Sequence, residues 1–322
     1  MRPPTDVVES FQVRFERKWS HLTRPHVRAL AWLLDAPDLL DPASAHWGGR
    51  IASLGPASDA DAAWLAALER DPAALDAALG PRFYSRLGLY AEKLLAFYFA
   101  SRGVLVAHGL QVRANKNDTV GEFDFLLRRG AALLHWEFAT KFYLLDGAPD
   151  EGRFHRLIGP NLADSLGLKM SKILDRQLAL GRHPAARALL PQAVDGAQAL
   201  VKGCLFYPGG LVRPMEGISP AHNHGFWSTL EQLDGLAGER FIVMPRLQWL
   251  APLKVAVGAH VYDRAALRQA LALQFDTAPA AVMVAAVRAE NDWEIESERG
   301  FIVPDDWSSQ AAARRAAGTL PQ

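Results

Sequence analysis

The spacing of hydrophobic residues changes near residue 104, and this change divides the chain into a helical first part and a strand-rich second part. In the first part, apolar residues recur every three or four positions, which is typical of amphipathic helices. The predicted helices span residues 27–39, 59–71 and 85–103. Pro37 interrupts the first helix, and the Gly-, Pro- and Ser-containing stretch 41–57 is expected to be a loop.

After residue 104 the apolar residues alternate with a period of two, which predicts strands. Three strands are expected at residues 104–114, 122–129 and 132–145, and the last two form a hairpin that turns near Arg129 and Gly130. An amphipathic helix at 161–180 and a strand at 199–208 follow. Beyond these, short strands alternate with helices, which are predicted at 226–235 and 264–275.

The order of these elements predicts a mixed α/β fold. Between residues 85 and 208 the order is helix, three strands, helix, strand. The predicted regions are a helical N-terminal region at 1–80, an α/β core at 81–208 and an α+β extension at 209–322. The Pro- and Gly-rich segment 208–225 is the candidate boundary, although it is also compatible with a long loop inside one domain.

Composition narrows the function only slightly. Lys plus Arg and Asp plus Glu both number 35, so a nucleic-acid site has to be a local patch and not a property of the whole surface. The single Cys204 excludes an intrachain disulfide and is expected to fill the core. The first residues contain no apolar signal-peptide core, and no apolar stretch has the length of a membrane span. We therefore expect a cytoplasmic protein with no membrane contact.

Four ionisable residues lie along the otherwise apolar hairpin: Glu122, Asp124, Glu137 and Lys141. Residues two apart on a strand share a face, so Asp124 and Glu137 can converge if the strands pair tightly. Two close carboxylates raise each other's pKa unless a cation such as Mg²⁺ or Mn²⁺ neutralises them through oxygen ligands. With Lys141 placed to act on a water or a phosphate, the hairpin predicts metal-assisted hydrolysis of phosphodiester bonds.

The motif Gly121-Glu122-x-Asp124, followed on the next strand by a glutamate and a lysine, resembles the PD-(D/E)xK nuclease superfamily. Its members share a restriction-endonuclease-like αβββαβ core, which matches the predicted order of elements. The resemblance implies a magnesium-dependent enzyme acting on nucleic acid, with DNA as the expected substrate. The implied catalytic residues are Glu92, Asp124, Glu137 and Lys141. The implied metal ligands are Asp124, Glu137, the main-chain carbonyl of Phe138 and, as outer or second-metal ligands, Glu122 and Glu92.

One position departs from the superfamily pattern. The lysine usually stands two residues after the glutamate, where this chain has Ala139, and Lys141 follows one strand repeat later on the same face. A lysine side chain can reach back over the ~6–7 Å that separate the two positions. Longer segments, among them "LGLYAEKLLAFYF", "WEFATKFYL" and "GPNLADSLGLKM", resemble a bacterial family of unknown function, DUF1853, that is grouped with these nucleases.

The helix after the hairpin has a basic face that could contact phosphates. The expected substrate-binding residues are Lys169, Lys172, Arg176 and Gln177. An ordinary solvated helix face remains the alternative. His222 and His224 lack a third ligand of known position, so a loop that is anchored by Phe226 and Trp227 is the favoured interpretation. Trp32, Trp249 and Trp293 are expected in the core.

Two other functions stay open at this stage. The protein could be a nucleic-acid-binding protein of the same fold that has lost catalysis. For the hairpin residues themselves, the alternative to a metal site is a structural ion pair between the carboxylates and the lysine. The helical N-terminal region and the C-terminal third could also be the surfaces of a protein-interaction scaffold. Displacement of the lysine from position 139 and the zero net charge favour the first of these alternatives.

Overall fold

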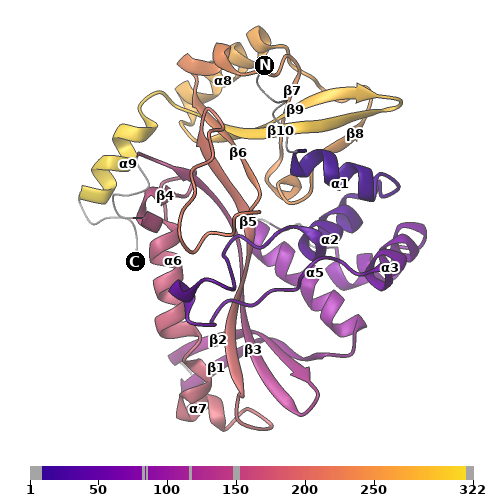
Figure 1. The fold of residues 1–322 in the computed structure, drawn as a ribbon, viewed down its shortest axis with the longest axis vertical. Coiled ribbons are helices and arrows are strands. Elements are labelled where there is room, and N and C mark those ends of the chain that lie inside the picture. The colour runs from indigo at the N-terminus through magenta and orange to yellow at the C-terminus, as the bar shows by residue number, and fades with distance from the viewer. Residues whose placement is uncertain (1–8, 82–83, 85, 116–117, 148–152, 317–322) are drawn as a thin grey trace, which may run out of the picture.

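The computed structural model describes residues 9–81, 84, 86–115, 118–147 and 153–316, and these residues form helices packed around a large mixed sheet (Figure 1). The N-terminal region is helical, as predicted, with α1 (Phe11–Trp19), α2 (Pro25–Asp35), η1 (Ala45–Trp47), α3 (Asp59–Arg70) and α4 (Ala73–Leu79).

The predicted order of helix, three strands, helix and strand is confirmed. Its elements are α5 (Leu87–Ser101), β1 (Leu105–Asn115), β2 (Asp118–Arg129), β3 (Ala132–Leu145), α6 (Leu166–Lys172) and β5 (Gly196–Pro208). Gly130 closes the β2–β3 hairpin in the left-handed conformation, with φ of 60°. Shorter elements lie between β3 and β5: η2 (Arg153–Arg156), β4 (Leu157–Ile158), the π-helical turn η3 (Ile173–Gln177), η4 (Leu180–Arg182) and α7 (Pro184–Arg187).

The helix expected from residue 161 begins later than predicted. Ser165 caps α6 by accepting the N–H of Leu168, and α6 ends where the π-helical turn η3 begins. Residues 159–164 form a loop instead, in which Leu162 adopts a left-handed conformation with φ of 56°. Apolar spacing alone did not reveal this loop, because Leu162 is buried as a helical leucine would be.

The described strands form one ten-stranded sheet that continues past the expected boundary at 208–225. The C-terminal elements are β6 (His224–Thr229), η5 (Glu231–Gly235), β7 (Phe241–Val243), η6 (Arg246–Gln248), β8 (Lys254–Ala256), α8 (Arg264–Thr277), β9 (Val282–Glu290), β10 (Trp293–Val303) and α9 (Trp307–Ala316). The strand order is β1-β2-β3-β5-β6-β10-β9-β7, with β4 beside β3 and β8 beside β10. β6 pairs in parallel with both β5 and β10, so it joins the core to the extension.

The helix predicted at 226–235 is wrong in its first half, where the chain forms strand β6. Phe226 and Trp227 are buried on opposite faces of this inner strand, which gives an apolar run without the alternation of a half-exposed strand. Gly225 also fits only a strand packed tightly against its neighbour, because a Cβ there would lie 2.3 Å from the carbonyl oxygen of Arg299. The anchoring role expected for Phe226 and Trp227 is confirmed, but in a strand and not in a loop.

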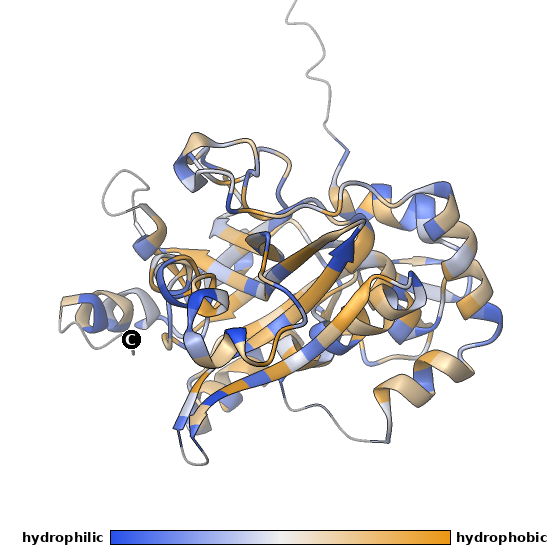
Figure 2. Cartoon of the chain, turned by 90° about the horizontal axis from the view of Figure 1, so that it is seen from below, coloured by the Kyte–Doolittle hydropathy of each residue, from blue (hydrophilic) through white to orange (hydrophobic). Residues whose placement is uncertain are grey.

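The hydrophobic core lies on both faces of the central strands (Figure 2). The helices α1, α2, α3 and α5 cover one face of β3 and β5, whereas α6 and the segment around Trp47 cover the other. Alternate residues of β3 enter the two layers, with Phe138 on the α5 side and Ala139 on the α6 side. Cys204 of β5 is 2% exposed, as expected for a core residue, and burial raises the pKa of its thiol to about 12.

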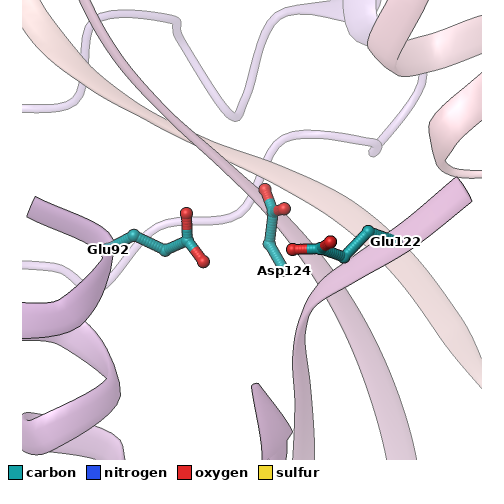
Figure 3. A group of neighbouring side chains, drawn as sticks. All are labelled: Glu92, Glu122 and Asp124. Atoms are coloured by element: carbon teal, nitrogen blue, oxygen red, sulfur yellow. The ribbon is translucent and has the colours of Figure 1, made fainter. Parts of the chain in front are cut away.

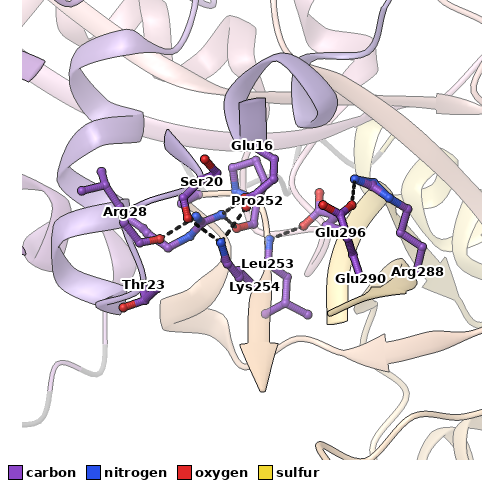
Figure 4. Close-up of polar contacts among 12 residues, drawn as sticks. Glu16, Ser20, Thr23, Arg28, Pro252, Leu253, Lys254, Arg288, Glu290 and Glu296 are labelled. Carbon is purple, nitrogen blue, oxygen red and sulfur yellow. Dashed lines mark hydrogen bonds and ion pairs between the residues drawn. The ribbon is translucent and has the colours of Figure 1, made fainter. Parts of the chain in front are cut away.

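A buried group of charges fastens the N-terminal helices to the extension (Figure 4). Glu16 of α1 accepts from Arg28 of α2 at 3.0 Å and from Lys254 of β8 at 2.7 Å. Arg28 also donates to the carbonyl of Pro252, and Lys254 to the carbonyl of Ser20. One carboxylate therefore balances two cations that come from opposite ends of the chain.

The substitution Glu16→Gln is expected to lower the free energy of unfolding by about 3–5 kcal/mol, because it leaves Arg28 and Lys254 buried without an anion. Chemical denaturation measures this loss. The matched control is Glu290→Gln, which removes an exposed partner of Arg288 on the same side of the molecule and should change stability by less than about 0.5 kcal/mol. Equal effects of the two substitutions would contradict a stabilising role for the buried group.

Candidate metal centre in a basic cleft

Three carboxylates converge at the junction of α5 and β2 (Figure 3). Glu92 of α5 and the pair Glu122 and Asp124 of β2 each offer an oxygen, and these oxygens all lie within 4.8 Å of one another. The expectation that Glu122 and Asp124 point the same way agrees with this geometry. Glu92, which was expected beside the metal only from the superfamily resemblance, is the third member.

A local irregularity of the β1–β2 ladder shapes this junction. Asp124 and Gly109 stand opposite each other between the pairs Leu110↔Phe123 and His108↔Phe125. Gly109 has φ of 62°, a conformation that other residues rarely adopt. Phe123 and Phe125 would share a face in a regular strand, yet they belong to different cores on opposite sides of the sheet. The ladder thus changes face at Asp124.

Two hydrogen bonds orient the converging carboxylates. His108 of β1 lies 2.7 Å from Glu92 through its Nε2, and the main-chain N–H of Phe138 donates to Asp124 at 2.9 Å. Burial, and secondly the charge of Glu137, raise the pKa of Asp124 to about 7, against the opposing effect of the Phe138 N–H and of Lys169. A cation placed beside such a carboxyl stabilises its ionised form, which is unfavourable in the free protein.

Glu137 lies behind this group and already has partners for both oxygens. It is 1% exposed, its Oε1 lies 2.7 Å from Nε2 of His135, and its Oε2 accepts from Gln177. Gln177 is the last residue of the π-helical turn η3, and such turns recur at functional sites. Glu137 is close enough to Asp124 to raise the pKa of that residue, but it is not one of the three carboxylates that converge. Its role as a metal ligand, and that of the Phe138 carbonyl, remain predictions.

The two lysines of the site have different surroundings. Lys141 donates to Asp164 at 2.7 Å, and the Tyr143 hydroxyl donates to the same Asp164 oxygen at 2.9 Å. Lys169 of α6 carries no such partner among the described residues, and its charge acts on Asp124. Burial, and then the positive charge of Lys141, lower the pKa of Lys169, while the carboxylates of Asp124 and Glu137 raise it. Of the two lysines, Lys169 is therefore the one without an acidic partner in the described residues, and its charge acts on Asp124 and Glu137.

Glu92 and Asp124 of this site line a cleft of about 620 Å³, whereas Glu122 is not among its lining residues. Its walls come from the start of α5, from β3, from the loop 159–164, from α6 with η3, and from η6. Of the four expected substrate-binding residues, Lys169 and Gln177 line the cleft. Lys172 and Arg176 are exposed and lie outside its lining, so the predicted basic face is divided by the fold.

Sequence patterns missed three charged residues of the cleft: Arg86, Asp164 and Arg246. Asp164 precedes α6 and meets Lys141 across 23 residues of sequence, a distance that no strand or helix period connects. Arg246 belongs to η6 in the extension. The only local signal was the motif "RLQWLAPL", which contains Arg246 and Trp249 but has no recognised chemical pattern.

The remaining candidates have structural surroundings. His222 is buried and hydrogen-bonds the Tyr207 hydroxyl at 2.8 Å, and burial lowers its pKa to about 4. Trp32 and Trp249 are in the core, as expected, whereas Trp293 is half-buried beneath Lys254.

The fold and the cleft together define a mixed α/β protein with a candidate metal-binding cleft at the junction of its core helix and hairpin. Residues 28–303 match a family described as "Domain of unknown function (DUF1853)". The chain belongs to the DUF1853 family, which confirms that resemblance. No curated protein and no solved structure matches the chain. Within the described residues, every helix is too short or too polar to cross a membrane.

The substitution Asp124→Asn is expected to stabilise the metal-free protein at pH 8 by on the order of 2–4 kcal/mol. The amide oxygen can still accept the Phe138 N–H, but the charge is gone. Because the pKa of Asp124 rises from 3.8 to about 7 on folding, the cost of its ionisation is absent below about pH 4, grows between pH 4 and 7, and is complete above 7.

Urea denaturation in the presence of a chelator, at pH 4.5 and at pH 8, measures this dependence. The gain should be small at pH 4.5. Asp175→Asn, at an exposed residue of η3, is the control and should have little effect at either pH. A gain from Asp124→Asn that is the same at both pH values would contradict the raised pKa.

Proposed function

We propose that this protein hydrolyses phosphodiester bonds of nucleic acid, with DNA as the expected substrate, in a reaction that depends on Mg²⁺ or Mn²⁺. The observation that carries the proposal is the convergence of Glu92, Glu122 and Asp124, because two of these carboxylates, Glu92 and Asp124, line a cleft that also holds Lys141 and Lys169. Carboxylates that bind a divalent ion and cations that bind phosphate are the two parts that such hydrolysis requires.

The three carboxylates fit one divalent ion after a small contraction. Two oxygens on opposite sides of an ion with bonds of 2.0–2.1 Å are separated by about 4.2 Å, and those around Ca²⁺ by about 4.6–5.2 Å. The oxygens of Glu92, Glu122 and Asp124 lie within 4.8 Å of one another. Their hard oxygen donors suit Mg²⁺ and Mn²⁺, and their repulsion in the free protein favours binding of a cation.

Each residue of the site has a defined task in this proposal. A bound ion would supply neutralisation of the phosphate charge and activation of a water. Glu92 and Asp124 would hold it in orientations set by His108 and by the Phe138 N–H, and such supporting hydrogen bonds strengthen metal sites. Lys169 binds the phosphate or orients the attacking water beside Asp124. Lys141 contributes less, because Asp164 holds its ammonium group.

A second function is favoured by the surroundings of Glu137. With His135 and Gln177 as partners of its oxygens, and with Ala139 at the usual position of the lysine, the site also suits a protein that binds nucleic acid without cleaving it. The scaffold hypothesis treats the C-terminal third as a surface for protein partners. Part of that third, η6, lines the cleft, so the structure gives this hypothesis no comparable support.

Cleavage of labelled single-stranded, double-stranded and branched DNA in Mg²⁺ or Mn²⁺ tests the proposal. Asp124→Asn and Glu92→Gln are expected to reduce the rate at least about 100-fold, since each removes a charged ligand of the ion. Retention of the wild-type rate by both variants would exclude this site. Mn²⁺ binding by calorimetry without any cleavage would instead favour the inactive binding protein.

The two lysines are distinguished by their methionine substitutions. Lys169→Met is expected to lower the cleavage rate about 10²–10⁴-fold, and Lys141→Met much less, because Lys169 acts on Asp124 while Lys141 is paired with Asp164. Lys172→Met, on the exposed side of α6, is the matched control and should leave the rate unchanged within twofold. A larger loss of cleavage rate from Lys141→Met than from Lys169→Met would show that Lys141 is the principal lysine of the reaction.

A further inference from the structure

Two arginines line the cleft from segments that lie far apart in the sequence. Arg86 immediately precedes α5, and Arg246 begins η6. Both residues are exposed, and both belong to the same cleft as Asp124. Leu89, in the first turn of α5, also lines the cleft and is 51% exposed. The outer part of the cleft is therefore built jointly by the core and by the C-terminal extension.

Neither guanidinium is neutralised by an acidic side chain of the described residues. In the same cleft, Lys141 is paired with Asp164. Arg246 lies over Trp249 instead, with its guanidinium carbon 5.6 Å from the ring centroid. This is a cation–π contact, which does not use up the N–H donors of a guanidinium.

Trp249 is well fixed as a support for Arg246. The indole is 8% exposed, its N–H donates to the carbonyl of Met244 at 3.1 Å, and its ring packs edge-on against Phe142 and Phe301. A rigid support reduces the conformational entropy that Arg246 loses when it binds a ligand. Such preorganisation favours binding of a ligand by Arg246, compared with an arginine whose side chain is free in solvent.

The chemistry of the cleft points to a ligand with several phosphates along its length. Planar guanidiniums bind phosphate oxygens through paired hydrogen bonds. Arg86 and Arg246 are exposed, whereas Glu92, Asp124 and Lys169 in the same cleft are half-buried. A linear polyanion can contact both parts at once. The exposed Leu89 adds apolar surface to the wall of the cleft.

The size of the cleft favours a single strand. Its volume of about 620 Å³ lies within the ~300–1,000 Å³ of pockets that enclose small ligands. Asp124 is half-buried inside it, between walls from α5, β3 and α6. A flexible single strand can carry a phosphate down to Asp124, whereas the backbone of an intact duplex is held outside by its paired bases and second strand.

We propose that Arg86 and Arg246 form a phosphate-binding rim that admits single-stranded nucleic acid, and not intact duplex, to the carboxylates of the cleft. The proposal rests on the proposed function in taking a phosphodiester backbone as the ligand. It goes further by assigning the form of the substrate and by giving the C-terminal extension a part in binding it. The exposed residues Lys172 and Arg176 have no such part.

Binding without cleavage tests this inference separately from hydrolysis. The full-length Asp124→Asn protein is titrated, in a chelator and again in Ca²⁺, against a labelled 12-nucleotide single strand of DNA, the same sequence of RNA, and the blunt DNA duplex. Fluorescence anisotropy should give an affinity for single-stranded DNA or RNA at least about tenfold higher than for the duplex. Equal or tighter binding of the duplex would overturn the inference.

The arginines are tested in the same background. Arg86→Gln and Arg246→Gln are each expected to weaken single-strand binding about 5–20-fold and to reduce the slope of log K against log salt by about 0.7, the value for one phosphate contact. Arg86→Lys and Arg246→Lys keep the charge and should recover part of the loss. Circular dichroism and urea denaturation of each variant ensure that the loss reflects binding in a folded protein.

Matched controls separate this rim from other basic surfaces. Arg129→Gln at the tip of the β2–β3 hairpin, and Arg176→Gln on η3, should each change the affinity less than twofold. A loss from Arg176→Gln as large as that from Arg246→Gln would place the strand on the outer helix face and overturn the inference. So would competition by a free mononucleotide at the concentration of the oligonucleotide, which would show that the cleft takes a single nucleotide.

The outcomes for hydrolysis and for the rim are independent. If the wild-type protein binds single strands through Arg86 and Arg246 but never cleaves them, the proposed hydrolysis is rejected and the phosphate-binding rim is retained. If cleavage is lost in Asp124→Asn but unchanged in Arg86→Gln and Arg246→Gln, the proposed hydrolysis is retained and the phosphate-binding rim is rejected.

Discussion

The hydrogen bond from the Phe138 N–H to the Asp124 carboxylate is the contact on which the cleft depends. Pairing between β2 and β3 ends at Phe125 and Trp136, and beyond that point the Asp124 side chain supplies the acceptor that a neighbouring main chain would otherwise provide. The same carboxylate faces Glu92 and Glu122. The side chain that replaces the missing main-chain acceptor is therefore a carboxylate, placed where the two strands separate. The raised pKa of Asp124 shows that ionising this carboxylate costs free energy.

Local periodicity predicted the elements of the core and the pair on β2, because both depend on residues close together in sequence. The change of period at residue 104 located the strands, and the spacing of two placed Glu122 and Asp124 together. The place of Glu92 came from the superfamily resemblance and not from spacing. The same argument predicted that Asp124 and Glu137 converge across an ideally paired hairpin. The pairing of β2 with β3 stops at Phe125, however, so it does not include Asp124. The oxygens of Glu137 are hydrogen-bonded to His135 and Gln177.

Contacts between distant segments account for what the sequence did not reveal. Asp164 meets Lys141, and Arg246 joins the cleft of Arg86, only after the sheet has brought their segments together. The parallel arrangement of β5, β6 and β10 achieves this by extending one sheet from the core into the C-terminal third. It also explains why β6 did not look like a strand, since a strand covered on both faces loses the alternation by which strands are recognised.

Cys204 has a practical consequence of a different kind. It is the only cysteine of the chain, it lies on central strand β5, and burial raises the pKa of its thiol to about 12. Because the thiolate is the reactive form, both the burial and the raised pKa of Cys204 are expected to slow its reaction with a thiol reagent in the folded protein. The rate of alkylation of Cys204 therefore reports how often the structure around β5 opens.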